Sequence, residues 1–140
     1  MNLNKIFKNK KIIITGHTGF KGSWLTLSLN RFGAKVMGLS NGIPTSPSNF
    51  KASKVKNGII TKKLDIKNLK KLKKTIINFK PNFIFHLAAQ SLVRDSYKNP
   101  KDTWQTNLIG TLNILESIRY LNNKVTVILI TSDKAYKNVE

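Results

Sequence analysis

The sequence contains no cysteine and only six acidic residues among 140, against 25 Lys and Arg, so its formal net charge is +19. Without cysteine a disulfide scaffold or a thiolate metal site is excluded; we predict no metal site and expect a reducing, cytoplasmic location. No apolar run approaches the roughly 18–20 residues that a membrane-spanning helix needs, so we expect no membrane segment. One domain with 40% hydrophobic residues remains, which is large enough for a single core.

A positive charge of this size is typical of proteins that bind nucleic acids. However, 22 of the 25 basic residues are Lys and only three are Arg, the residue that sequence-reading proteins use for bidentate contacts. Lys, Asn and Ile together supply 54 of the 140 residues, and the codons of all three are rich in A and T. We therefore interpret the Lys excess as codon bias and expect no nucleic-acid partner; a basic interaction surface is the alternative.

Strand-like and helix-like patterns alternate along the chain. Short apolar runs predict β-strands at residues 11–15, 35–40, 58–64, 83–87 and 125–131. Amphipathic segments predict helices at residues 23–32, 67–79 and 101–121, the last carrying an apolar stripe of Leu108, Leu112, Leu115 and Ile118. Residues 41–57, rich in Ser and Pro, predict a long irregular loop. This order predicts an α/β fold, a doubly wound parallel sheet (Rossmann-like) with helices on both faces, truncated after the fifth strand.

A glycine-rich stretch, TGHTGFKG at residues 15–22, joins the first strand to the first helix. In this context Gly16 permits a tight turn, Gly19 lets backbone amides approach phosphate groups, and Gly22 allows the helix to pack closely. The helix N-terminus then presents its positive dipole end to an anion. The stretch predicts a site for the pyrophosphate of a dinucleotide; a structural turn without a ligand is the alternative.

The end of the second strand lacks the acidic residue that usually binds the ribose of NAD. Ser40 and Asn41 stand at this position, and no Arg is close by in the sequence to hold the 2′-phosphate of NADP. The choice between the two cofactors therefore stays open on these residues alone.

Five motifs, the first of which contains the glycine-rich stretch, follow one another in the chain: TGHTGFKGSWL (15–25), PTSPSNF (44–50), FHLAAQSLVRDSY (85–97), TNLIGTLNILE (106–116) and TSDKAY (131–136). In this combination the chain resembles the extended short-chain dehydrogenase/reductase superfamily, within it the NAD-dependent epimerase/dehydratase family, and more narrowly its CDP-glucose 4,6-dehydratase branch. The resemblance implies that NAD transiently oxidises C4 of the sugar of CDP-glucose, water leaves across C5–C6, and hydride returns to C6. It also implies a homodimer for the full-length protein.

The resemblance further implies a set of cofactor-binding residues. The pyrophosphate would be held by Gly16, His17, Thr18, Gly19, Phe20, Lys21 and Gly22. Asp65 and Ile66 would meet the adenine, with Ser40 at the end of the second strand. The ribose on the nicotinamide side would be lined by Leu87, Ala88, Ala89 and Gln90. Asn107 matches a structural Asn of the long helix, and Thr131 ends the fifth strand beside the cofactor and sugar.

The implied catalytic residues are Ser132, Asp133 and Lys134, which follow the fifth strand. Asp133 would protonate the departing C6 hydroxyl, and Lys134 would act as the C5 base if its pKa is lowered. An ordinary Asp-Lys turn is the alternative. Arg94 either contacts the substrate phosphate or lies on a solvated loop, and we interpret His86 as a hydrogen-bonded histidine at a strand end rather than a catalyst.

The superfamily's catalytic Tyr-x-x-x-Lys pair has no counterpart in these 140 residues. Tyr97 with Lys101 spans Pro100, and both this pair and Tyr120 with Lys124 precede the strand after which the family's pair lies. We therefore interpret residues 1–140 as an incomplete dinucleotide-binding domain, without the Tyr-x-x-x-Lys helix or the substrate domain, that binds a dinucleotide at most and has no turnover alone. Another NAD-dependent sugar-nucleotide epimerase or dehydratase, and a stand-alone NAD-binding module, are the alternatives.

Overall fold

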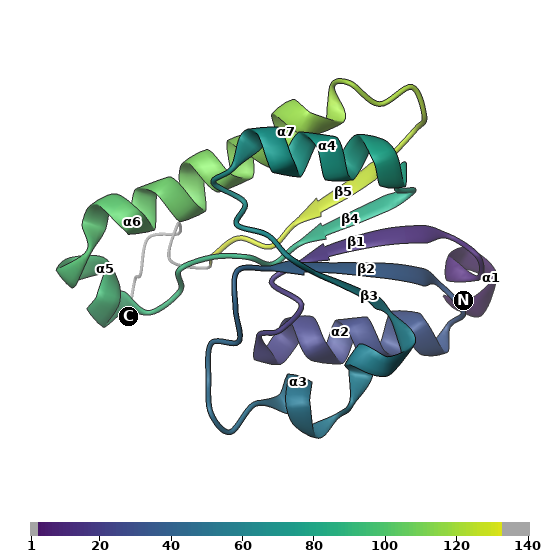
Figure 1. The fold of residues 1–140 in the computed structure, drawn as a ribbon, viewed down its shortest axis with the longest axis horizontal. Helices are drawn as coiled ribbons and strands as arrows, with labels where there is room; N and C mark the ends of the chain where they lie inside the picture. Colours follow the sequence, from purple (N-terminus) through teal and green to yellow (C-terminus); the bar gives the residue numbers. More distant parts are fainter. Residues whose placement is uncertain (1–2, 133–140) are drawn as a thin grey trace, which may run out of the picture.

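The structure is a computed structural model that describes residues 3–132, and a parallel β-sheet forms its centre (Figure 1). Its strands are β1 (Lys11–Thr15), β2 (Lys35–Ser40), β3 (Ile60–Lys63), β4 (Phe83–His86) and β5 (Thr126–Leu129). All neighbours pair in parallel, in the order β3-β2-β1-β4-β5. The predicted α/β, doubly wound, Rossmann-like sheet is thereby confirmed, and β1 lies at its middle, where the strand order reverses.

Both faces of the central strands β2, β1 and β4 are covered, which explains why these strands are mostly apolar without polar alternation. The edge strand β3 is exposed at all four residues. Ile13 packs on the face covered by α4 (Leu69–Phe79) and α7 (Gly110–Ile118), whereas Ile12 and Ile14 pack against α2 (Phe20–Arg31). All three isoleucines are fully buried. In Figure 1, α4 and α7 lie above the sheet, and α2 and α3 (Asn49–Ala52) lie below it.

Helix α2 begins at Phe20, three residues earlier than the sequence pattern predicts. Gly19 is its N-cap residue, with an extended backbone conformation and no capping side chain. The apolar pattern starts only at residue 23 because the first turn faces the glycine-rich stretch rather than the core, so hydrophobic periodicity carries no signal there. The first turn of α2 consequently lies within the predicted phosphate loop.

The segment predicted as an irregular loop at residues 41–57 contains two short helices, α3 and the 3-10 helix η1 (Val55–Gly58). Phe50 and Val55 anchor these helices because both side chains are buried. Ser48 caps α3 by accepting a hydrogen bond from the Lys51 amide. Because η1 occupies residues 55–58, β3 begins at residue 60 rather than at 58. The N-terminal helix α1 (Leu3–Phe7) was not predicted either; Phe7 packs edge-on against Phe83.

The helix predicted at residues 101–121 is interrupted. It consists of α6 (Pro100–Trp104), the π-helical turn η2 (Gln105–Ile109) and α7, and a separate α5 (Val93–Lys98) precedes it. Three of the four residues in the predicted apolar stripe, Leu108, Leu112 (54%) and Leu115, are exposed. The fourth, Ile118, packs against the core, and Ile114, which lies outside the stripe, is fully buried. Gly110, Asn113 and Ser117 share the buried face of α7 with Ile114. Because these residues are small or polar, the apolar periodicity of the sequence does not mark this face. None of the helices within residues 3–132 is long and apolar enough to cross a membrane.

The two faces of α7 provide a test of this correction. We expect Ile114→Ala to lower the free energy of unfolding by about 2–5 kcal/mol, because it leaves a cavity in the core between α4, α7 and the sheet. Leu112→Ala, two residues away on the same helix, should change it by less than about 0.5 kcal/mol. Urea denaturation of both variants measures the difference; equal losses would contradict this assignment of the buried face.

Candidate functional site

A cleft of about 790 Å³ lies at the carboxyl ends of the strands. Of the sixteen residues predicted to bind the cofactor, fourteen line it: Gly16, Thr18, Gly19, Phe20, Lys21, Gly22, Ser40, Asp65, Ile66, Leu87, Ala88, Ala89, Gln90 and Thr131. They come from segments far apart in the sequence, and the parallel sheet brings them to one edge. In open α/β sheets a crevice at this position is where ligands bind.

The glycine-rich turn is shaped by backbone contacts that leave no room for side chains. A Cβ on Gly22 would lie 2.1 Å from the carbonyl oxygen of Gly16, so the first turn of α2 rests directly on the end of β1. Gly16 has φ +71°, and a Cβ there would lie 2.8 Å from the Ala88 amide nitrogen. A Cβ on Gly19, by contrast, would meet only the Gly16 carbonyl oxygen, at 3.4 Å. The turn is therefore closed toward the protein and open at Gly19, as a phosphate cradle requires.

The N-terminus of α2 supplies the electrostatic part of this cradle. Gly19 donates its amide to the Gly16 carbonyl at 3.0 Å, and the Ser23 amide donates to the Gly19 carbonyl at 2.9 Å. No acidic residue lies in the first turn, which carries Lys21 instead. The positive end of the helix dipole thus faces the cleft without a neutralising carboxylate, and the residues present fit the pyrophosphate of a dinucleotide.

His17 lies within the glycine-rich stretch but does not line the cleft. Its ring is fully buried, packs edge-on against Phe50 at 5.1 Å, and fills the space above Gly38, where a Cβ would lie 2.2 Å from it. Neither ring nitrogen has a hydrogen-bond partner, and burial lowers the pKa of His17, with the Leu39 backbone offsetting part of this effect. A neutral His17 therefore anchors the turn to the layer of α3; its predicted contact with the pyrophosphate stays a prediction.

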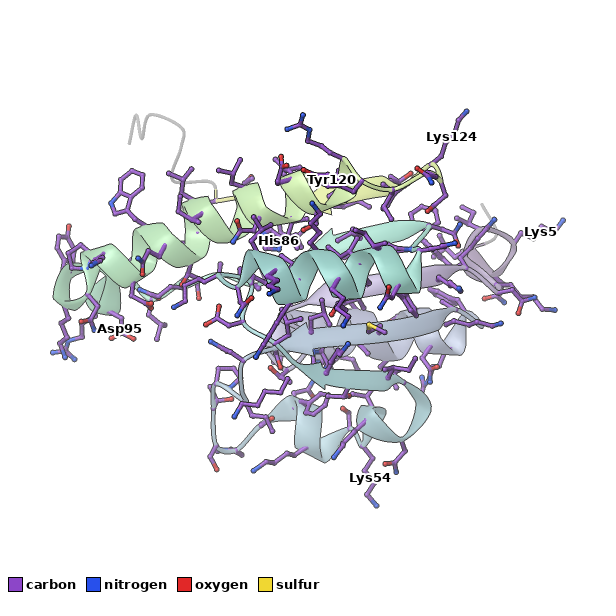
Figure 2. All side chains as sticks on the ribbon, turned by 45° about the horizontal axis from the view of Figure 1, so that its top comes forward. Lys5, Lys54, His86, Asp95, Tyr120 and Lys124 are labelled. Atoms are coloured by element: carbon purple, nitrogen blue, oxygen red, sulfur yellow. The ribbon has the colours of Figure 1, made fainter. Side chains whose placement is uncertain are left out.

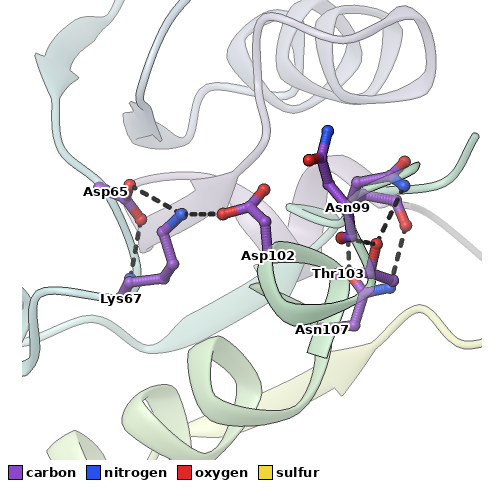
Figure 3. A network of polar contacts seen from close by, with 7 residues as sticks. Asp65, Lys67, Asn99, Asp102, Thr103 and Asn107 are labelled. Atoms are coloured by element: carbon purple, nitrogen blue, oxygen red, sulfur yellow. Dashed lines mark hydrogen bonds and ion pairs between the residues drawn. The ribbon is translucent and has the colours of Figure 1, made fainter. Parts of the chain in front are cut away.

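Asp65 lies on the opposite wall of the cleft, beside two charged neighbours (Figure 3). Its carboxylate accepts a hydrogen bond of 2.9 Å from the Lys67 amide. The Lys67 ammonium lies 3.7 Å from Asp65 and 2.6 Å from Asp102, whose hydrogen bond is the main cause that raises the pKa of Lys67. Asn113, buried in α7, donates to the Ile66 carbonyl and so ties this loop to α7. Sequence reasoning missed Asn113, because an Asn inside an apolar helix carries no local signal.

His86 joins three elements beneath the cleft. Its Nδ1 lies 2.7 Å from Thr15 Oγ1, and its Nε2 lies 3.0 Å from Thr111 Oγ1. Because the Thr111 hydroxyl donates to the Asn107 carbonyl, it accepts from Nε2–H, so Nδ1 accepts from Thr15. Thr15 Oγ1 also accepts the Ala88 amide at 3.1 Å, which places the backbone of the cofactor wall. Burial lowers the pKa of His86 to about 4. This arrangement agrees with the interpretation of His86 as a hydrogen-bonded histidine at a strand end.

Asn107 does not line the cleft but holds a residue that does. Its side chain accepts the Gln90 amide at 2.8 Å and donates to the Gln90 carbonyl at 2.9 Å, as a neighbouring strand would. Asn107 lies in the π-helical turn η2, which separates α6 from α7. The helix approaches Gln90 at this turn. Its predicted structural role is consistent with this geometry.

The remaining predicted residues lie away from the cleft or outside the described part. Arg94 is exposed on α5 and does not line the cleft, whereas its neighbour Asp95 does. Figure 2 shows Asp95 at the end of the molecule away from Lys5 and Lys124. Ser132 is exposed and is also not a lining residue. Asp133 and Lys134 lie outside the described residues.

Sequence reasoning missed about half of the lining, most of it in loops. These residues are Leu39, Asn41, Gly42, Ile43, Pro44, Thr45, Leu64, Ser91, Leu92, Asp95, Thr106 and Ile130. The length of the segment after β2 and its motif PTSPSNF were the available signal, because a long loop at a strand's carboxyl end faces the cleft.

Comparison with protein families relates this geometry to known proteins. The family model described as GDP-mannose 4,6 dehydratase matches residues 13–140. The chain is 44% identical over 134 residues to the CDP-glucose 4,6-dehydratase of Salmonella typhimurium. This match covers 96% of this chain and 37% of the relative. The chain therefore spans little more than a third of the length of this relative.

Solved structures share the fold. The UDP-glucose 4-epimerase of Stenotrophomonas maltophila, solved with bound NAD and formylated UDP-arabinopyranose, superposes with a TM-score of 0.81 at 18% identity. The match covers 93% of this chain and 39% of that one. The UDP-glucose 4-epimerase of Thermus thermophilus in complex with NAD has a TM-score of 0.68 at 29% identity, over 78% of this chain and 33% of that one.

The His86 network predicts a pH dependence of stability. The native state keeps His86 neutral down to about pH 4, whereas an unfolded histidine takes up a proton near pH 6.5. Stability should therefore fall as pH drops from 6.5 toward 4, by up to about 1.4 kcal/mol per pH unit and about 3 kcal/mol in all. His86→Gln should be less stable at pH 7 yet should lose this component of the slope.

The measurement is urea denaturation of both proteins between pH 4 and 8. His17, whose pKa is also lowered, is present in both and cancels in the comparison. Identical slopes in the two proteins would contradict a neutral, buried His86.

Proposed function

The chain belongs to the GDP-mannose 4,6 dehydratase family of NAD-dependent epimerases and dehydratases, and we propose that it forms the cofactor-binding part of a CDP-glucose 4,6-dehydratase. The glycine cradle carries this proposal, because backbone contacts at Gly16 and Gly22 close the turn while Gly19 leaves it open to the cleft. The 44% identity to the Salmonella typhimurium enzyme supports CDP-glucose as the substrate of the whole protein.

The lining residues divide among the parts of NAD. Gly19 and the first-turn amides of α2 would bind the pyrophosphate, with Asp65 and Ile66 at the adenine. Ala88 and Gln90, which Thr15 and Asn107 hold in place, would line the ribose on the nicotinamide side. When bound, NAD supplies the transient oxidation at C4 of the sugar and the hydride that returns to C6.

The residues after β5 would carry the proton transfers. Asp133 would give a proton to the departing C6 hydroxyl, and Lys134 would accept one from C5, with Ser132 beside them. Arg94, exposed on α5, would reach the phosphate of the nucleotide sugar. A homodimer of the whole protein and a cytoplasmic location stay predictions.

A sugar-nucleotide epimerase is the alternative activity, since the structural relatives named above are UDP-glucose 4-epimerases. The Asp-Lys pair at residues 133–134 favours the dehydratase, because eliminating water needs an acid at C6 that an epimerase does not use.

Binding of NAD⁺ tests the cofactor site directly. We expect the 140-residue chain to bind NAD⁺ in isothermal titration calorimetry, and Gly22→Ala to weaken binding at least tenfold, because its Cβ displaces the Gly16 carbonyl and with it the cradle. Lys70→Ala, an exposed change on α4 outside the cleft, serves as the control and should bind as the unaltered chain does. Failure of the unaltered, folded chain to bind NAD⁺ would overturn the proposal.

A fusion tests the catalytic part. Joined to the remainder of the Salmonella typhimurium relative, this chain should yield the 4-dehydro-6-deoxy sugar from CDP-glucose, whereas the chain alone should yield none. Asp133→Asn in the fusion should lower kcat by about 10²–10⁴-fold, as loss of a general acid does, without changing the affinity for NAD⁺. A fusion that binds NAD⁺ but forms no product, or an Asp133→Asn variant with full activity, would contradict the assigned roles.

A further inference from the structure

The backbone of residues 88–90 is held by side chains rather than by a neighbouring strand, because β4 ends before this segment. The Ala88 amide donates to Thr15 Oγ1 at 3.1 Å, and the Gln90 amide donates to Asn107 Oδ1 at 2.8 Å. All three residues of the segment line the cleft. Two of them are alanines, so the course of the backbone sets the shape of this part of the cleft.

The two side chains that hold this segment are linked to each other by further hydrogen bonds. Thr15 Oγ1 lies 2.7 Å from His86 Nδ1, and His86 Nε2 lies 3.0 Å from Thr111 Oγ1. The Thr111 hydroxyl donates to the Asn107 carbonyl at 2.6 Å. These four side chains, of Thr15, His86, Thr111 and Asn107, form with the cleft segment a closed hydrogen-bond ring.

The direction of the bonds in this ring is set at Thr111. Burial lowers the pKa of His86 to about 4, so its imidazole carries one hydrogen at pH 7. The Thr111 hydroxyl gives its own hydrogen to Asn107 and therefore accepts from Nε2–H of His86. Nδ1 is then left to accept from the Thr15 hydroxyl, whose oxygen accepts the Ala88 amide. Thr111 thus fixes the tautomer of His86 and, through it, the bonds at Ala88.

The helical segment that carries Thr111 and Asn107 is itself held in place by packing. Asn107 lies in η2, and Thr111 lies in the first turn of α7. Gly110, next to Thr111, packs directly on the cleft-lining residue Ile66, because a Cβ on Gly110 would lie 2.4 Å from Ile66 Cδ1. The start of α7 therefore cannot shift without disturbing Ile66. A broken bond in the ring is taken up instead by residues 88–90, which have no neighbouring strand.

We propose that the hydrogen-bond ring positions residues 88–90 as one unit, so that Thr111 sets the affinity for the nicotinamide half of the dinucleotide without touching it. The inference rests on the proposed function, which assigns this segment to the ribose on the nicotinamide side. The four side chains of the ring lie outside the lining of the cleft, so they act on a ligand through the backbone that they hold. ADP contains the adenine and the pyrophosphate but lacks the nicotinamide half, and therefore separates the two parts of the site.

Calorimetry with NAD⁺ and with ADP on the 140-residue chain at pH 7 tests this inference. Thr111→Val keeps the shape of the side chain but leaves either Nε2–H of His86 or the hydrogen of the Thr15 hydroxyl without its acceptor. We expect it to weaken NAD⁺ binding about tenfold and ADP binding by less than about twofold, since an unpaired polar group displaces only the segment that the ring holds. Thr111→Ser retains the hydroxyl and should keep both affinities within about twofold.

Ser117→Ala is the matched control. Ser117 is buried on the same helix, and its hydroxyl donates to the Asn113 carbonyl at 2.6 Å, the same kind of bond that Thr111 forms. Its loss should change neither affinity.

Asn107→Ala opens the ring at its other end and, as a change at an exposed residue, decides the question if Thr111→Val does not fold. It should likewise weaken the binding of NAD⁺ but not of ADP. Combined with Thr111→Val it should cost less than the product of the two single losses, because a unit that is already broken cannot be broken again.

Nitrogen NMR of the imidazole reads the ring independently of binding. The sequence contains two histidines, so His86→Gln identifies the signals of His86. They should show the Nε2–H tautomer in the unaltered chain and lose it in Thr111→Val, a change that a merely space-filling role of Thr111 does not produce.

Equal losses of NAD⁺ and ADP affinity in Thr111→Val would show a general loosening of the fold and overturn the inference, as would an Nδ1–H tautomer in the unaltered chain. Unchanged NAD⁺ affinity in Thr111→Val or in Asn107→Ala also overturns it and leaves the proposed function intact. If the folded, unaltered chain does not bind NAD⁺, the proposed function itself fails.

Discussion

The candidate site depends on one close approach, that of the first turn of α2 to the end of β1. Backbone touches backbone there, and a single added carbon on Gly22 would lie 2.1 Å from the Gly16 carbonyl oxygen. Because the first turn of α2 lies directly against the end of β1, its N-terminal amides and the positive end of its dipole face the crevice at the carboxyl ends of the central strands. Gly16 also lies directly against Ala88, so the turn and the part of the cleft lined by residues 87–90 fix each other's position.

Around this contact the interior is polar but uncharged. His86 forms hydrogen bonds with Thr15 and Thr111. Asn107 accepts a hydrogen bond from the Gln90 amide, and Asn113 donates one to the Ile66 carbonyl. Burial keeps His86 neutral, since a charged ring would have to be desolvated without a counterion. Although the chain has a net charge of +19, the wall of the cleft at residues 88–90 is held by hydrogen bonds between neutral groups, which salt screens little.

The distribution of acidic residues gives the two sides of the cleft different characters. All six Asp and Glu residues follow residue 64. In one part of the cleft, Asp65 and Asp102 form ion pairs with Lys67. The cavity that adjoins the cleft at Ser40 has four lysines and no carboxylate in its lining. The fold determines which of the many lysines face a cavity.

Local patterns were sufficient to predict the parallel sheet and the place of the glycine turn, because strand hydrophobicity and glycine spacing are properties of adjacent residues. The same patterns misjudged α7, where Gly110, Asn113 and Ser117 share the buried face with Ile114 while Leu112 is exposed. Partners such as Asn113 and Ile66, or His17 and Phe50, lie dozens of residues apart, so no window of sequence could pair them. By itself the sequence determined the class of fold and the position of the glycine-rich turn between β1 and α2. Only the tertiary structure decided that His17 turns away from the cleft and that Asn113 reaches the Ile66 carbonyl, because packing between distant elements, not local preference, sets these contacts.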